Sequence, residues 1–188
     1  HPSVAGVCAQ LEKQGWEVTG LPVYGNGLVR IEDVAEAVRP DTVLITIMLA
    51  NNEIGTIQPI RDIGALVRER RAAGQRYLWL HTDAVQAAGR VPLNVDELGC
   101  DLLTISGHKL YAPKGVGALY VRSGTRLDSL VHGAGHEGGR RAGTENVPYI
   151  AALGAACALA GRRLAAGSAE RTRALRDRLH DLLQESVP

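Results

Sequence analysis

The stretch Asp-Thr-Val-Leu-Ile-Thr-Ile-Met-Leu-Ala, residues 41–50, contains the longest nearly continuous apolar run in the chain. It is rich in valine, isoleucine and threonine, which favour strands, and its apolar residues occupy successive rather than alternate positions. That pattern is typical of a strand buried on both faces, as in a parallel sheet covered by helices. The run is far shorter than the roughly 20 residues that span a bilayer, so we expect no membrane-crossing segment.

Helices and further strands are predicted on both sides of this run. Apolar residues at helical spacing predict a helix at 31–38, stopped by Pro40, and a second at 60–71, closed by Gly74. An alanine-rich helix up to residue 166 and an arginine-rich helix at 169–183 follow later. Shorter apolar segments predict strands at 14–23, 77–81, 101–106 and 117–121. Strands alternating with helices predict an α/β fold with three layers, α/β/α, around a mostly parallel sheet.

The composition is that of an ordinary globular protein. The 188 residues include 21 Lys and Arg against 20 Asp and Glu, and 45% are hydrophobic. Nucleic-acid binding requires clustered basic residues in excess, so we expect no nucleic-acid partner. The three cysteines, Cys8, Cys100 and Cys157, cannot all pair with one another, which favours a reducing and therefore cytoplasmic location.

Polar residues of unusual kinds follow three of the predicted strands. They are Asn51-Asn52-Glu53, His81-Thr82-Asp83-Ala84-Val85-Gln86 and Ser106-Gly107-His108-Lys109. In open α/β sheets ligands bind beyond the carboxyl ends of the strands, so the three segments are expected to meet at one site. Any one of them alone is explained equally well as a loop cap, since polar residues are common on loops.

Lys109 and Asp83 together indicate a particular chemistry. Lysine is scarce, at Lys13, Lys109 and Lys114, and Lys109 follows a strand, so it lies at the expected crevice. A partly desolvated lysine can lose its proton and form a Schiff base with an aldehyde. A carboxylate such as Asp83 keeps the ring nitrogen of pyridoxal phosphate (PLP) protonated and so strengthens that cofactor as an electron sink. The alternative interpretation is a structural salt bridge between the two side chains.

Other candidate motifs are weaker. Residues 133–138 match a dinucleotide-binding pattern, but no helix is predicted directly behind them and no acidic residue stands about 20 positions on. His132 and His136 lack the further ligands that a metal site needs, so no metal is predicted. The glycine-rich segment that continues to Thr144 is interpreted as an anion-binding or interface loop. The three cysteines lie beside apolar residues or a strand and are interpreted as buried, inert thiols.

Four segments occur in an order that is known from one enzyme family. They are Leu49-Ala50-Asn51-Asn52-Glu53-Ile54-Gly55, His81-Thr82-Asp83-Ala84-Val85-Gln86, Ser106-Gly107-His108-Lys109 and Arg141-Ala142-Gly143-Thr144-Glu145-Asn146. They resemble the cysteine desulfurase and selenocysteine lyase family of class V aminotransferase-like enzymes, and the resemblance runs over nearly the whole chain. It implies a PLP-dependent transferase of fold type I, with a large domain at 1–160 that lacks its N-terminal part. An exit helix at 161–188 is then expected to lead to a C-terminal small domain.

The resemblance also implies roles for residues at the strand ends. Lys109 resembles the lysine that binds the cofactor and shuttles protons, and Asp83 resembles the acid on the ring nitrogen. Asn52 is similar to the residue near the ring oxygen and the substrate carboxylate. Gln86 is similar to a second contact of that oxygen.

Four further positions follow from the resemblance. Ser106 and His108 resemble ligands of the cofactor phosphate. Thr144 resembles a threonine that reaches the phosphate in the neighbouring subunit, so the resemblance implies a homodimer with sites at the interface. His1 aligns with a catalytic histidine that stacks on the pyridine ring.

The family converts L-cysteine or L-selenocysteine to L-alanine. The sulfur passes to an enzyme cysteine as a persulfide that supplies iron–sulfur clusters or thiolated products, so a sulfur-acceptor protein is an expected partner. The resemblance places that cysteine, and the arginine that binds the substrate carboxylate, beyond Pro188. Residues 1–188 are therefore expected to bind the cofactor without complete desulfurase activity. Two alternatives stay open: a catalytically incomplete interaction module with the same fold, and another class V enzyme acting by transamination or β-elimination.

Overall fold

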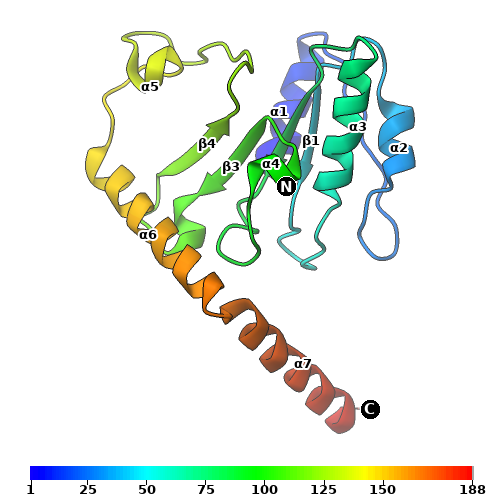
Figure 1. Ribbon diagram of the computed structural model, residues 1–188, viewed down its shortest axis with the longest axis vertical. Helices are drawn as coiled ribbons and strands as arrows, with labels where there is room; N and C mark the ends of the chain where they lie inside the picture. Colours follow the sequence, from blue (N-terminus) through cyan, green and yellow to red (C-terminus); the bar gives the residue numbers. More distant parts are fainter. Residues whose placement is uncertain (188) are drawn as a thin grey trace.

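The computed structural model describes residues 1–187, which form one mixed sheet flanked by helices (Figure 1). The strands are β1 (Leu44–Met48), β2 (Trp79–Asp83), β3 (Leu102–Ser106) and β4 (Gly117–Val121), and they lie in this order across the sheet. The β1–β2 and β2–β3 pairs are parallel, whereas β4 runs antiparallel to β3. The predicted α/β class with a mostly parallel sheet is therefore confirmed.

Among the described residues, two α-helices precede β1, one stands between β1 and β2 and one between β2 and β3, and three follow β4. Lys109 lies in a 3₁₀ turn, η1 (Gly107–Leu110), directly after β3. The α-helices among residues 1–187 are α1 (Pro2–Lys13), α2 (Ile31–Ala37), α3 (Ile60–Ala72), α4 (Val95–Leu98), α5 (His136–Gly139), α6 (Val147–Ala165) and α7 (Ser168–Ser186).

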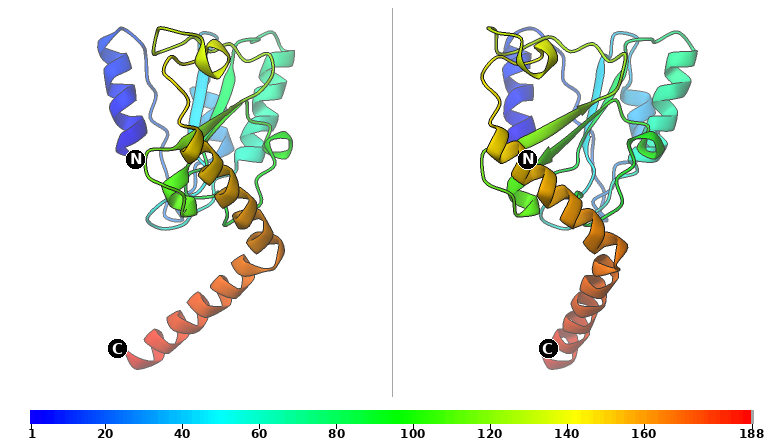
Figure 2. Two further views of the ribbon diagram at one scale, coloured as in Figure 1. Left: turned by 90° about the vertical axis from the view of Figure 1, so that its left-hand side faces the viewer. Right: turned by 60° about the vertical axis from the view of Figure 1, so that its left-hand side comes forward.

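The two faces of the sheet differ in polarity. Leu80 of β2 is fully buried and belongs to one apolar cluster with Ile63 and Val67 of α3. Figure 2 shows α3 and α4 on this side of the sheet and α1 on the other. Because successive residues of a strand point to opposite faces, His81 and Asp83 lie on the face toward α1. No residue of α1 is buried, so that face is covered loosely.

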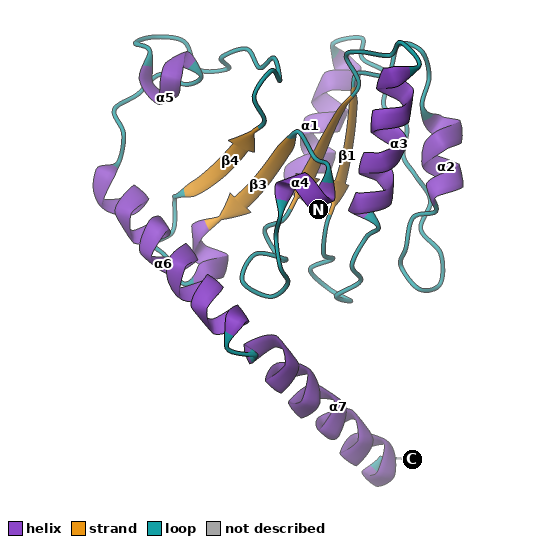
Figure 3. Ribbon diagram, viewed as in Figure 1, coloured by secondary structure: helices purple, strands orange, loops and turns teal. Residues whose placement is uncertain are grey.

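The predicted strand at 14–23 is wrong. Figure 3 shows the connection between α1 and α2 as loop, and among residues 1–187 no strand lies beyond β1 to pair with it. A strand needs a ladder of backbone hydrogen bonds, and Pro22 has no N–H to contribute. The other predicted elements are present with shifted ends; the consequential shift is in β2, which continues two residues beyond the predicted end and so includes Asp83.

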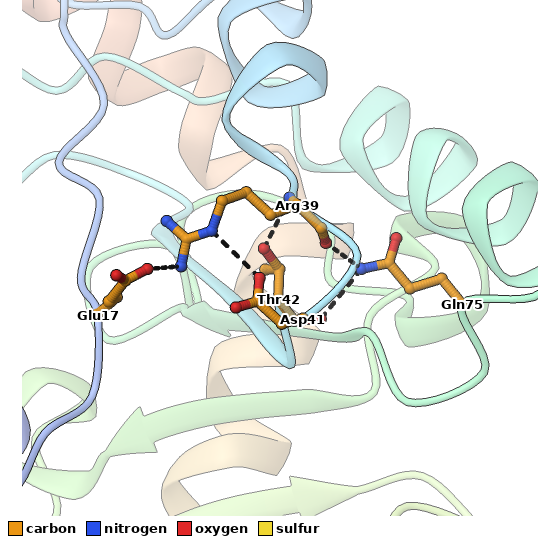
Figure 4. A network of polar contacts seen from close by, with 5 residues as sticks. All are labelled: Glu17, Arg39, Asp41, Thr42 and Gln75. Carbon is orange, nitrogen blue, oxygen red and sulfur yellow. Dashed lines mark hydrogen bonds and ion pairs between the residues drawn. The ribbon is translucent and has the colours of Figure 1, made fainter.

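A polar network holds this loop in place of strand pairing (Figure 4). Arg39 forms an ion pair with Glu17 of the loop, and its Nε donates to Asp41 Oδ1 at 3.1 Å. The Arg39 backbone N–H donates to Thr42 Oγ1 at 2.9 Å. Gln75, which follows α3, donates through Nε2 to the carbonyl oxygens of Arg39 and Thr42 at 2.6 and 3.1 Å. The loop is thereby tied to the α2–β1 turn and to the end of α3.

The last two helices leave the body of the molecule. α6 packs on η1, and Leu153 of α6 is buried beside Leu110. α7 extends away from the sheet, at 67° to α6, and has no buried residue (Figure 1). No single helix in residues 1–187 is long and apolar enough to cross a membrane, and only α6 and α7 taken together as a bent pair pass on length and composition. The predicted boundary at 160/161 falls inside α6, and the division into domains stays a prediction.

Candidate functional site

Asp83 lies in the middle of the sheet, at the edge where the three parallel strands end. It is the last residue of β2, and its register partners are Met48 of β1 and Thr104 of β3. The side chain is half-buried, and its Oδ1 accepts a hydrogen bond from the Val85 N–H at 2.9 Å. This bond fixes the carboxylate over the carboxyl edge of the sheet.

Lys109 is brought to the same edge by the tight turn η1. Gly107 begins the turn with so little space around it that an added Cβ would lie 2.9 Å from the Val116 carbonyl oxygen and 2.8 Å from its side chain. Leu110 ends the turn, buried in a cluster with Ala88 and Leu153. Lys109 itself is half-buried between these two anchors. Lys109 is therefore observed directly after a strand, at the carboxyl edge of the sheet, and its role in a binding crevice stays a prediction.

The structure also tests whether Lys109 and Asp83 form a salt bridge with each other. Among the ion pairs of residues 1–187, none involves Lys109 or Asp83. The alternative interpretation, a structural salt bridge between the two side chains, is therefore not observed. Both charged groups stay available to a third group at the carboxyl edge.

Ser106 and His108 flank the same turn. The Ser106 hydroxyl and His108 Nδ1 are 2.8 Å apart, and the imidazole is exposed. A hydroxyl and an imidazole held together beside a backbone turn are suitable donors for a phosphate. Their predicted role as phosphate ligands stays a prediction.

Asn52 and Gln86 line one hollow at the ends of β1 and β2. The hollow has a volume of about 280 Å³ and is lined by residues of the loop after β1 and of the turn after β2. Asn51 fixes that loop because its side-chain Oδ1 accepts from the backbone N–H groups of Glu53 and Ile54 at 2.8 and 2.9 Å. The structure thus brings together two residues that are 34 positions apart in the sequence.

His1 and Thr144 stand apart from these residues. His1 is exposed at the start of α1, where Nδ1 accepts from the Ser3 N–H at 3.2 Å. Figure 2 places the N-terminus on the α1 side, close to the level of η1. Thr144 is exposed in the segment between α5 and α6, and α5 lies at the opposite end of the sheet from η1 (Figure 1). The segment that carries Thr144 thus connects α5, at that far end, to α6, which packs on η1.

Sequence reasoning assigned no role to a third histidine at the site. His81, two residues before Asp83, bonds through Nδ1 to Thr46 Oγ1 at 2.7 Å and through Nε2 to Thr104 Oγ1 at 2.9 Å. Burial lowers the pKa of His81, and the negative charge of Asp83 opposes that shift only in part. The signal was one threonine inside each flanking apolar strand, Thr46 in register with His81 and Thr104 in register with Asp83.

The remaining candidates contribute no chemistry to this edge. Cys100 is buried, which raises its thiol pKa, whereas Cys8 and Cys157 are only partly buried, so the expectation of three buried thiols is correct for one of them. Within residues 1–187 no group of three or more His, Cys, Asp or Glu side chains could hold a metal. In the glycine-rich segment, Glu137 and Gly138 have positive φ, so α5 is not a regular helix.

Comparison with known proteins gives the family. A model described as aminotransferase class V matches residues 1–187. The chain belongs to this family. It is 53% identical over 160 residues to a cysteine desulfurase IscS of Methanosarcina thermophila, covering 85% of the chain and 38% of that relative.

Two solved structures of related proteins agree with this assignment. A NifS-like protein superposes with a TM-score of 0.91 at 36% identity over 98% of the chain and 49% of its own length. A structure of SspA in complex with cysteine gives a TM-score of 0.78 at 45% identity over 84% of the chain and 44% of its own length. The chain spans at most about half the length of these proteins. The predicted family and fold type are confirmed.

The family also confirms the predicted cofactor class, because cysteine desulfurases and class V aminotransferases depend on PLP. The residues present fit that group. Asp83 offers a carboxylate outside any ion pair of residues 1–187, and the half-buried Lys109 offers an amine in the turn that follows the next strand, β3. Ser106 and His108 offer donors beside the turn that carries the lysine. A carboxylate, an amine and phosphate donors are the groups that PLP requires.

Proposed function

We propose that this chain is the cofactor-binding part of a PLP-dependent cysteine desulfurase. The observation that carries the proposal is the placement of Asp83 at the end of β2 and of Lys109 in η1, directly after the adjacent parallel strand β3. Both side chains lie at one edge of the sheet and outside any ion pair of residues 1–187. The cysteine desulfurase at 53% identity supports the reaction class. Bound PLP supplies an electron sink for charge that develops at the α-carbon of an amino acid.

Each residue has a defined task in this proposal. The Lys109 amine holds the cofactor and moves the proton at the substrate α-carbon, a task that suits a lysine because its pKa responds to its surroundings. The Asp83 carboxylate holds the ring nitrogen in its protonated form. Ser106 and His108 hold the phosphate, and His1 covers the ring from the α1 side.

The substrate is L-cysteine or L-selenocysteine in this proposal, and the product is L-alanine. The structure of SspA with cysteine supports the sulfur amino acid. Asn52 and Gln86 line a hollow at the same edge, and Asn52 is suited to contact the substrate carboxylate. The sulfur passes to a cysteine other than Cys8, Cys100 and Cys157, and from there to an acceptor protein, in a reducing, cytoplasmic setting.

The proposed assembly is a homodimer. Thr144 is exposed in the segment between α5 and α6, where it is suited to serve the cofactor of a second copy. The first turns of α6 expose Val147, Tyr149 and Ile150, which a second copy would cover.

Covalent trapping tests cofactor binding directly. The chain is incubated with PLP, reduced with borohydride and mapped by peptide mass spectrometry. We expect a phosphopyridoxyl adduct on Lys109, absent in Lys109→Ala and unchanged in the control Lys114→Ala. Equal labelling of Lys13, Lys109 and Lys114, or no adduct at all, contradicts the proposal.

A further inference from the structure

The ring of His81 is held from both sides by uncharged partners. Thr46 on β1 lies 2.7 Å from Nδ1, and Thr104 on β3 lies 2.9 Å from Nε2. A neutral imidazole has one N–H donor and one acceptor nitrogen, and a threonine hydroxyl serves as either partner. Both bonds therefore form with a neutral ring, whichever nitrogen carries the hydrogen.

These bonds cross all three parallel strands just before they end. Thr46 is the register partner of His81, and Thr104 is the register partner of Asp83. The bond from His81 to Thr104 therefore runs diagonally toward the carboxyl edge. The segments that carry Asn52 and Lys109 continue from β1 and β3, so the bonds fix the spacing of the strands that carry the site.

The charge of the ring matters because Asp83 is its neighbour on the same face. The partners that bond to His81 from β1 and β3 are threonines, and the charged group that acts on it is Asp83. Burial lowers the pKa of His81, which favours the neutral form. A cationic ring beside Asp83 would compete for its negative charge, whereas a neutral ring leaves that charge for another cation.

We propose that His81, clamped between Thr46 and Thr104, is a positioning residue that holds Asp83 in line with the pyridine nitrogen of the cofactor. The inference rests on the proposed function. His81 acts through Asp83 and the strand spacing, not by contact with the reacting atoms.

The test removes the two hydroxyls and leaves Asp83 and Lys109 in place. In the double variant Thr46→Val/Thr104→Val, the dissociation constant for PLP is measured by absorbance titration. The pH at which the spectrum of the bound cofactor changes is measured in the same samples. We expect binding about tenfold weaker, from two lost hydrogen bonds, and a displaced spectral pH midpoint because the ring nitrogen meets a misplaced carboxylate.

Controls separate positioning from stability. Thr104→Ser keeps the hydroxyl, and His81→Gln keeps one donor and one acceptor, so both are expected to retain most of the binding and the spectral midpoint. A double valine variant that unfolds at lower urea but keeps the wild-type dissociation constant and spectrum overturns the positioning role. In that case the wild-type adduct on Lys109 still supports the proposed function. A wild-type chain without the adduct overturns both.

Discussion

An aspartate lies at each end of the parallel strands, one at the amino edge and one at the carboxyl edge, and the two carboxylates differ in burial and in their bonding partners. Asp101, directly before β3 at the amino edge, is 1% exposed and accepts from Arg71 at 2.5 Å and from the Leu80 N–H at 2.8 Å. Asp83, at the carboxyl edge, is half-buried, accepts from the Val85 N–H and forms no ion pair within residues 1–187.

The difference separates a structural carboxylate from a functional one. Burying a charge is costly unless partners inside the chain satisfy it, and Asp101 has a charged partner and a backbone donor. The fold supplies Asp83 with one backbone bond and no opposite charge. The carboxylate that the fold leaves incompletely satisfied is the one for which a ligand remains the natural partner.

The largest loss of stability is expected when the buried Asp101 at the amino edge is replaced. Asp101→Ala leaves the Arg71 guanidinium without its carboxylate and the buried Leu80 N–H without an acceptor. We expect a loss of about 3 kcal/mol in the free energy of unfolding, measured by urea titration of tryptophan fluorescence. Asp96→Ala is the matched control, because its ion pair with Arg122 is largely exposed at the aspartate, and should cost less than about 1 kcal/mol. Equal losses in the two variants would contradict the structural role of Asp101.

Substitution of Asp83 at the carboxyl edge is expected to change stability little and to abolish cofactor binding. Asp83→Ala removes one hydrogen bond from a half-buried side chain, so we expect a stability change of about 1 kcal/mol and loss of PLP binding. Asp83→Asn retains an acceptor for the Val85 N–H and should be closer to wild type in stability, yet it should not restore the charged partner of the ring nitrogen. Normal cofactor titration in Asp83→Asn would remove Asp83 from the site.

Sequence patterns predicted the carboxyl edge well because the chemistry is concentrated in short segments. The continuous apolar runs gave β1 to β4, and the polar residues after them gave Asp83 and Lys109. Residues 14–23 were misassigned because strand formation depends on a partner, and no local pattern shows that β1 is the edge strand. The clamp on His81 was missed for a similar reason: Thr46 and Thr104 belong to different strands and meet the ring only through the register.

The smallest effect is expected in the pH dependence of stability, which reports the charge state of His81 in the cofactor-free chain. Its pKa is lowered in the folded chain by burial, so below the ordinary histidine pKa of about 6.5 the unfolded chain binds the extra proton first. Stability from this residue is therefore complete above that pH and falls as the pH drops toward the folded pKa. Urea midpoints at about pH 7.5 and 5.5 should fall further in wild type than in His81→Gln, which keeps both hydrogen-bonding functions but cannot titrate. Equal declines would mean that the folded chain accepts the proton as readily as the unfolded one. His81 would then share the negative charge of Asp83, and the two edges would no longer differ in the way their carboxylates are balanced.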